Sequence, residues 1–177
     1  MLDRGRSGGI LDAVAGRRGG EGLRSGVGRV ALWLEPRRVT EDIDLVGLHG
    51  TAEERFALMH LAHSLGIPVE AVNSAADFFV RRIDGWREQL EVFRTGARAT
   101  VYRPTATLFV LLKMRRLSER DLADCRAALA RAAADGATVD RSRLLAALDG
   151  LDAATGEGLA PRRAELRTLI EGGAGAG

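Results

Sequence analysis

The chain has 177 residues, of which 46% are hydrophobic and 28% charged, a composition typical of a globular protein with one real core. Its net charge of +2 is too small to indicate a strongly basic nucleic-acid-binding protein. The longest apolar run, Leu108 to Leu112, is too short to span a membrane, and the N-terminus lacks the apolar segment of a secretory signal. Cys125 is the only cysteine, so no internal disulfide can form. We therefore expect a cytoplasmic protein with no membrane partner.

Residues 1–26 are rich in glycine and arginine and show little hydrophobic periodicity. This composition predicts a disordered N-terminus, because too little apolar surface is available for a core. A nucleic-acid-binding arm of the Arg-Gly type is the alternative. It is less favoured, because no aromatic residues are interleaved with the arginines for bases to stack on.

The next part of the chain alternates between strand and helix signals. Thr51-Ala52-Glu53-Glu54 has the pattern of a capping box and predicts the start of a helix. In chain order we expect a strand over 37–46, a helix over 51–65, a strand over 67–72, a short helix over 73–80, and a hairpin formed by 89–94 and 97–102 around Gly96.

From Pro104 onward the sequence is helical. Residues 105–117 are apolar nearly all round and predict a buried helix, and Ser118 is expected to cap the next helix, which runs to about Gly136. Two further helices are expected over 140–148 and 161–171. We predict an α+β fold in which a short mixed sheet is packed by helices. Its core spans 27–103, a C-terminal helical segment of the same domain spans 104–171, and 172–177 form a flexible tail.

The predicted strand over 37–46 carries a pair of carboxylates. Since side chains alternate along a strand, Arg38, Thr40, Asp42 and Asp44 share one face. Two carboxylates at this spacing repel each other unless a cation lies between them, and Mg²⁺ prefers oxygen ligands and keeps positions free for phosphates. The alternative is an exposed acidic strand end in which Arg38 pairs with one carboxylate.

Further candidate residues are spread along the chain. Gly28 could bring backbone N–H groups close to a phosphate, or be a plain turn glycine. Glu70 lies in an apolar strand, where a carboxylate needs either solvent or a cation. Lys113 and Arg116 follow the apolar run, and a solvated helix end with salt bridges is the alternative for them. Of the 26 basic residues Lys113 is the only lysine, which suggests a compact point charge in a tight site.

Taken together, these segments resemble the nucleotidyltransferase superfamily, whose core is related to DNA polymerase beta. The resemblance covers roughly residues 27–130. It rests on Val27-Gly28-Arg29, Arg38-x-Thr40-x-Asp42-Ile43-Asp44, Val69-Glu70-Ala71, Lys113-x-x-Arg116 and Asp121-x-x-Asp124. Within the superfamily the chain is most similar to the AbiEii-type toxin nucleotidyltransferases and their bacterial relatives.

The resemblance implies Mg²⁺-dependent transfer of a nucleotidyl group from an NTP to a hydroxyl of RNA, protein or a small molecule. Asp42, Asp44 and Glu70 would be the catalytic, metal-binding carboxylates, with Mn²⁺ as an alternative metal. The residues implied to bind the substrate are Gly28, Arg38, Thr40, Lys113, Arg116 and Asp121. Candidate partners are a tRNA acceptor and, as in a toxin–antitoxin system, an antitoxin protein.

One position departs from the family pattern. Arg29 stands where the family has its second glycine or serine. This favours an alternative function, a catalytically inactive protein of the same fold that binds a partner protein or RNA. A third and weaker interpretation is a metal site formed by His60 and His63, with His49 as a further imidazole.

Overall fold

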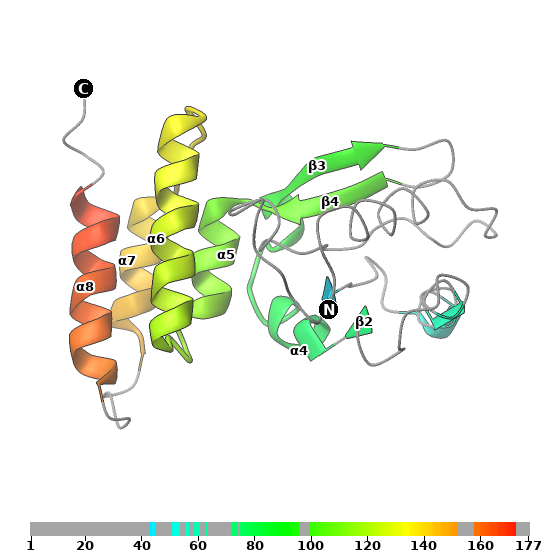
Figure 1. Ribbon diagram of the computed structural model, residues 1–177, viewed down its shortest axis with the longest axis horizontal. Helices are drawn as coiled ribbons and strands as arrows, with labels where there is room; N and C mark the ends of the chain where they lie inside the picture. Colours follow the sequence, from blue (N-terminus) through cyan, green and yellow to red (C-terminus); the bar gives the residue numbers. More distant parts are fainter. Residues whose placement is uncertain are drawn as a thin grey trace. The chain divides into compact units, whose positions relative to one another are not determined.

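The structure is a computed structural model that describes residues 43–44, 51–53, 56, 59–60, 63, 72–73, 75–95, 100–151 and 158–172 (Figure 1). The chain separates into two compact units, residues 1–104 and 105–177. The predictions for residues 1–26 and 172–177 lie outside the described residues, Gly172 excepted, which ends the last helix.

The first unit contains a short parallel pair of strands. Strand β1 (Ile43–Asp44) pairs with β2 (Val72–Asn73), with Ile43 opposite Val72 and Asp44 opposite Asn73. The two residues of β1 confirm part of the strand predicted over 37–46, and Val72 confirms the end of the next one. Between the strands, the described residues that follow Thr51 are all helical: Ala52, Glu53, Phe56, Met59, His60 and His63. A parallel pair needs such a crossover connection.

A short helix and a tight turn follow β2. Helix α4 (Ala75–Val80) was predicted to begin at Asn73, but Asn73 belongs to β2 and the helix starts two residues later. The backbone then turns, with Gly85 at φ 64°, into the 3-10 helix η2 (Arg87–Gln89). Val80 and Trp86 are buried and anchor the two ends of the turn.

The predicted hairpin is present. Strands β3 (Leu90–Thr95) and β4 (Thr100–Pro104) pair antiparallel, with Leu90 opposite Pro104 and Thr95 opposite Thr100. Their register shifts between Val92 and Arg94, an irregularity that the sequence analysis did not predict. Both strands end later than expected, and the salt bridge between Arg103 and Glu91, at 2.9 Å, links a facing pair.

These elements confirm the α+β class. The described strands form two separate two-stranded sheets, β1–β2 and β3–β4, so the single mixed sheet of a nucleotidyltransferase fold remains a prediction. Among the helices that the structure describes, none has both the length and the apolar character needed to cross a bilayer.

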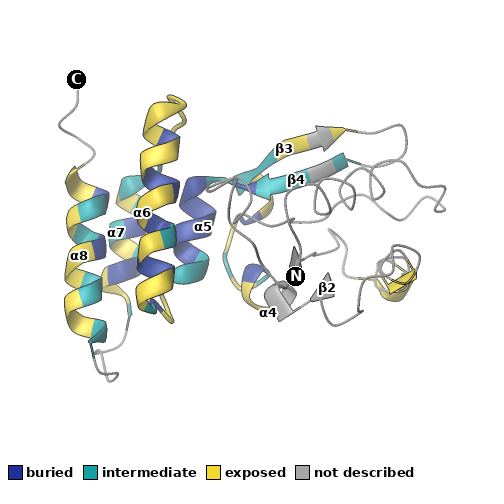
Figure 2. Cartoon of the chain, viewed as in Figure 1, coloured by how far each residue is buried: buried dark blue, intermediate teal, exposed yellow. Residues whose placement is uncertain are grey.

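The described residues of the second unit form a bundle of four helices: α5 (Ala106–Lys113), α6 (Glu119–Ala134), α7 (Arg141–Asp149) and α8 (Leu159–Gly172). Helix α5 packs on α6 and α7, and α8 packs on the same two helices, so the four surround a common core (Figure 1). Three of the helices contribute fully buried residues to this core: Leu108, Leu144, Leu166 and Ile170. Helix α5 is coloured as buried over most of its length (Figure 2). The burial predicted for residues 105–117 is confirmed for most of α5.

Side-chain caps fix where these helices begin. Ser118 forms the predicted cap of α6, as a capping box with Asp121. Thr105 caps α5, and its hydroxyl accepts a hydrogen bond from the Leu108 backbone N–H at 3.2 Å. Asp140 caps α7, and its own N–H donates to the buried Thr107 hydroxyl at 3.0 Å, which ties the start of α7 to α5.

Helix α5 ends at Lys113 and not at Leu117 as predicted. Leu117 is fully buried with φ at 38°, a left-handed conformation that is costly for a branched residue. Its carbonyl accepts a 2.7 Å hydrogen bond from Arg162 Nε of α8. The chain thus reverses at a leucine, without the glycine that usually marks such a reversal. Because the apolar pattern of the sequence continues through this leucine, it predicted a helix longer than the one observed.

Candidate functional site

The structure brings together three of the predicted substrate-binding residues, Lys113, Arg116 and Asp121, at the junction of α5 and α6. The Asp121 carboxylate lies at their centre and is only 1% exposed. Its two oxygens accept five hydrogen bonds, from Lys113, twice from Arg116, and from the hydroxyl and backbone N–H of Ser118. A buried carboxylate needs this many donors to stay ionised away from water.

The protonation state of Asp121 follows from these contacts. Burial acts to raise its pKa, but the hydrogen bonds from Arg116, Lys113 and Ser118 and the charge of Lys113 outweigh that effect. The pKa of Asp121 therefore lies well below its usual range, and the side chain is a carboxylate at neutral pH.

Lys113 is enclosed by negative and aromatic groups. Its Nζ lies 2.8 Å from Asp121 Oδ1, 3.8 Å from Asp124 Oδ2 and 5.7 Å from the centre of the Phe109 ring. The side chain is 28% exposed. Lys113 is thus partly buried at the end of α5, with two carboxylates facing its charge, which agrees with both interpretations drawn from the sequence.

Arg116 differs from Lys113 in its access to solvent. It lies in the turn after α5, and its Nε and Nη2 donate to Asp121 Oδ2 and Oδ1 at 2.8 and 2.9 Å. Its side chain is nevertheless 76% exposed. The hydrogen bonds and the charge of Asp121 raise the pKa of Arg116, so the guanidinium is a permanent cation.

Ser118 belongs to this cluster although it was not predicted as a site residue. Its hydroxyl donates to Asp121 Oδ2 at 2.7 Å and accepts from the Asp121 backbone N–H at 3.2 Å. The sequence signal was the capping box itself, since a Ser followed three residues later by an acid fixes that acid beside the helix start.

The predicted carboxylate site lies mostly outside the described residues. Asp44 is in β1, next to Asn73 of β2, but its side chain is not described. The other members predicted in the first unit lie outside the described residues: Gly28, Arg38, Thr40, Asp42 and Glu70. Among the residues that the structure describes, no group of three or more acidic, histidine or cysteine side chains could hold a metal ion, and the predicted histidine pair, His60 and His63, is exposed.

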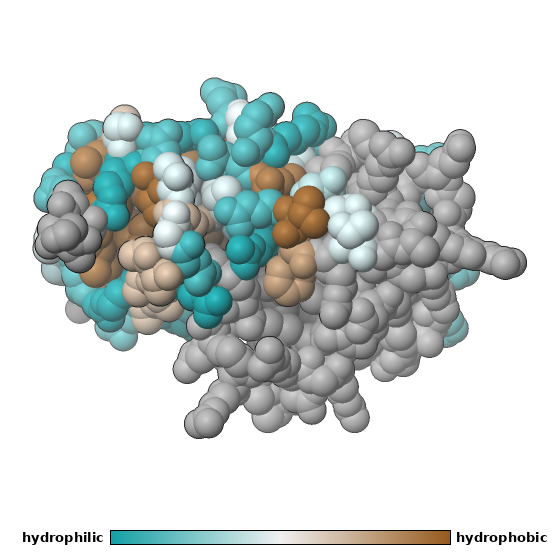
Figure 3. Space-filling view, turned by 90° about the horizontal axis from the view of Figure 1, so that it is seen from above, coloured by the Kyte–Doolittle hydropathy of each residue, from teal (hydrophilic) through white to brown (hydrophobic). Residues whose placement is uncertain are grey.

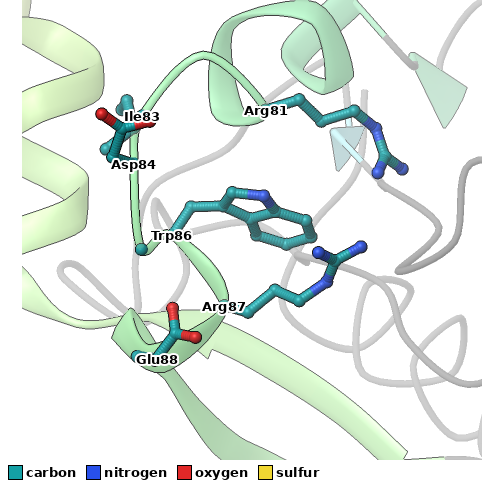
Figure 4. A pocket seen from close by; sticks show the side chains of 7 residues that line it. Arg81, Ile83, Asp84, Trp86, Arg87 and Glu88 are labelled. Atoms are coloured by element: carbon teal, nitrogen blue, oxygen red, sulfur yellow. The ribbon is translucent and has the colours of Figure 1, made fainter.

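A second candidate is a shallow pocket of about 270 Å³ in the turn after α4. The guanidinium carbons of Arg81 and Arg87 lie 5.6 and 4.8 Å from the centre of the buried Trp86 ring. Both guanidinium groups extend past the same end of the indole, while Asp84 and Glu88 point the other way (Figure 4). Sequence analysis missed this arrangement, for which the only signal was the clustering of arginines around the tryptophan.

Hydrophilic side chains border the apolar ones on the face seen from above (Figure 3).

A comparison of the chain with protein-family models, curated proteins and solved structures found no match.

Proposed function

We propose that the protein is a Mg²⁺-dependent nucleotidyltransferase that moves a nucleotidyl group from an NTP to a hydroxyl acceptor. The observation that supports this most directly is the parallel pairing of β1 with β2. Asp44 lies in β1, Asp42 is two positions before it in the sequence, and Glu70 precedes Val72 of β2 by two positions. Carboxylates on or next to two paired strands can share one metal ion, which is the arrangement that this proposal needs.

The carboxylates have distinct roles in this proposal. Asp42 and Asp44 would hold Mg²⁺, which suits a set of oxygen donors and would supply positive charge for the phosphates of the nucleotide. Glu70 completes the metal site or accepts the proton of the attacking hydroxyl. The hydroxyl oxygen forms a bond to the α-phosphorus, the bond from that phosphorus to the bridging oxygen breaks, and pyrophosphate leaves.

Positive and polar groups bind the triphosphate. Arg38 and Thr40 follow the same alternation as the two aspartates, and Gly28 supplies backbone N–H groups. The resemblance also implies Lys113 and Arg116 as substrate-binding residues, and within the second unit both are paired with the buried Asp121 carboxylate. The acceptor is RNA, such as tRNA, a protein or a small molecule, and the AbiEii resemblance favours a toxin with an antitoxin partner.

A second candidate function is supported by Arg29. This residue replaces the small residue that lets a phosphate approach the backbone in the family pattern. A protein of this fold without catalysis would bind a partner protein or RNA instead.

Incubation with each of the four NTPs, labelled at the α-phosphate, tests the proposal. Total RNA and total protein serve as acceptors, with Mg²⁺ or Mn²⁺ present. An active transferase labels one class of acceptor and releases unlabelled pyrophosphate, whereas the inactive alternative labels none.

A further inference from the structure

The guanidinium of Arg116 has two edges that can each bind an oxyanion, and the structure shows one of them occupied. Nε and Nη2 face Asp121, which occupies the side edge of the group. The opposite, end-on edge consists of Nη1 and the second N–H of Nη2. Neither of these groups has a hydrogen-bond partner among the described residues, and the side chain is 76% exposed. A planar guanidinium can donate two parallel hydrogen bonds from such an edge.

We propose that this end-on edge of Arg116 is a preset fork for one phosphate of the substrate, and that Asp121 is a positioning residue that acts only through it. The choice of a triphosphate as ligand rests on the proposed function. Asp121 already accepts five hydrogen bonds, so it has little capacity left for a substrate or a metal ion of its own. Its fixed place in the capping box keeps the guanidinium plane in one orientation.

Lys113 has a different part in this arrangement. Its ammonium faces Asp121 and Asp124 and is 28% exposed, so its charge balances the carboxylates. By contrast, Arg115 and Arg120 are exposed and form no ion pair within the described part of the chain. Of these three exposed arginines, only Arg116 is held by a buried carboxylate, so its free edge is the one with a fixed orientation.

The test uses inorganic triphosphate as the probe, in the absence of divalent metal. Calorimetric titration of the full chain compares the wild type with Arg116→Lys, which keeps the charge but loses the fork. Arg115→Lys is the matched control, because Arg115 is the neighbouring exposed arginine and has no carboxylate partner among the residues that the structure describes. We expect Arg116→Lys to weaken binding about tenfold, equal to about 1.4 kcal/mol, and Arg115→Lys to change it less than about twofold.

Asp121→Glu separates positioning from net charge. It keeps the negative charge but moves the carboxylate by one methylene, so any loss of affinity comes from the orientation of Arg116. We expect about fivefold weaker binding of triphosphate. Asp121→Asn tests the effect of charge separately. It makes the cluster more positive, so it would strengthen anion binding if charge alone mattered.

Three results would overturn the inference: no binding of triphosphate by the wild type, equal affinities for the Arg116 and Arg115 variants, or unchanged affinity in Asp121→Glu. Its failure is distinct from failure of the proposed function. Nucleotidyl transfer by a wild type whose triphosphate affinity does not depend on Arg116 refutes the inference alone. Arg116-dependent binding without any nucleotidyl transfer refutes the proposed function alone.

Discussion

The two units of the chain differ in how far their described apolar side chains are buried. In the bundle, α5 to α8, the large aliphatic residues facing the core are buried, and several have no solvent exposure. In the first unit, Val80 and Trp86 are the only buried hydrophobic residues among those described. All the large hydrophobic side chains that are exposed in the described part of the chain belong to that unit: Phe56, Met59, Phe78, Phe79, Val92 and Phe93.

Among the described residues, the buried apolar side chains that stabilise the fold are concentrated in the bundle. Helices bury an apolar stripe against their neighbours along the chain, and caps at Thr105, Ser118 and Asp140 set their starting points. Strands depend on pairing between segments distant in sequence, as for β1 and β2. We therefore expect core substitutions to be far more costly in the bundle than at the described aromatic positions of the first unit.

The largest expected effect is that of Leu108→Ala. Leu108 is fully buried in α5, so its truncation leaves a cavity and should lower the free energy of unfolding by about 3 to 4 kcal/mol. Phe79→Ala is the matched change in the first unit, where the side chain is 56% exposed, and should cost less than about 1 kcal/mol. Denaturant unfolding measures both values. Equal losses would show that the contrast between the units is wrong.

Asp121→Asn should have the next largest effect, about 2 to 3 kcal/mol at pH 7. It removes a buried carboxylate that accepts charged hydrogen bonds from Lys113 and Arg116. Asp135→Asn is the control at the C-terminal end of the same helix, because Asp135 forms an exposed pair with Arg131 and its loss should cost about 0.5 kcal/mol or less. Thermal and denaturant unfolding of the two variants show whether Asp121 stabilises the fold as a buried, hydrogen-bonded carboxylate or contributes no more than an ordinary surface charge.

The same variant has a predictable pH dependence. The pKa of Asp121 is lower in the folded state than its unfolded value of about 3.9, so its contribution is present above about pH 4 and is lost as the pH falls further. The free energy of unfolding of the wild type should decline from about pH 5 to pH 3, and Asp121→Asn should lack part of this decline. Parallel pH curves for the two proteins would contradict this.

Much of the bundle could be predicted from sequence because its signals are local. The start of α6 follows from the Ser118 capping box, and α7 and α8 follow from their periodic apolar residues. The end of α5 could not be predicted, since Leu117 adopts a left-handed conformation that its side chain disfavours. Burial of that leucine and the hydrogen bond from Arg162 to its carbonyl are tertiary effects, absent from any short window of sequence.

The candidate site shows the same division. Sequence named Lys113, Arg116 and Asp121 as members of one motif, and the structure places them in direct contact. The sequence did not show that these residues have different roles, because the roles depend on solvent exposure. Asp121 is buried, whereas Arg116 is open to solvent. Asp42 and Glu70, two of the predicted carboxylates, lie outside the described residues. For Asp44 the structure shows only that its backbone lies in a strand.

The smallest expected effect concerns Cys125, which reports on opening of the bundle. Its thiol is fully buried, and burial raises its pKa to about 12, so it should react only slowly with a thiol reagent at pH 8. Leu108→Ala should speed the labelling, because it lowers the free energy of opening, and Phe79→Ala should not. The labelling rate in native buffer, compared with that in denaturant, measures this. Fast reaction in the native wild type would show that α6 does not bury the thiol.

The most direct test of the central claim is transfer of label from an α-labelled NTP by the wild type and by Asp42→Asn/Asp44→Asn, under the same Mg²⁺ concentration. If the two aspartates hold the catalytic metal, the wild type labels an acceptor and the double variant loses at least about a hundredfold in rate, equal to about 2.7 kcal/mol of transition-state stabilisation. An unchanged unfolding curve for the double variant excludes loss of folding as the cause. Equal labelling by the two proteins, or no labelling by the wild type with any NTP, would contradict the proposed nucleotidyltransferase.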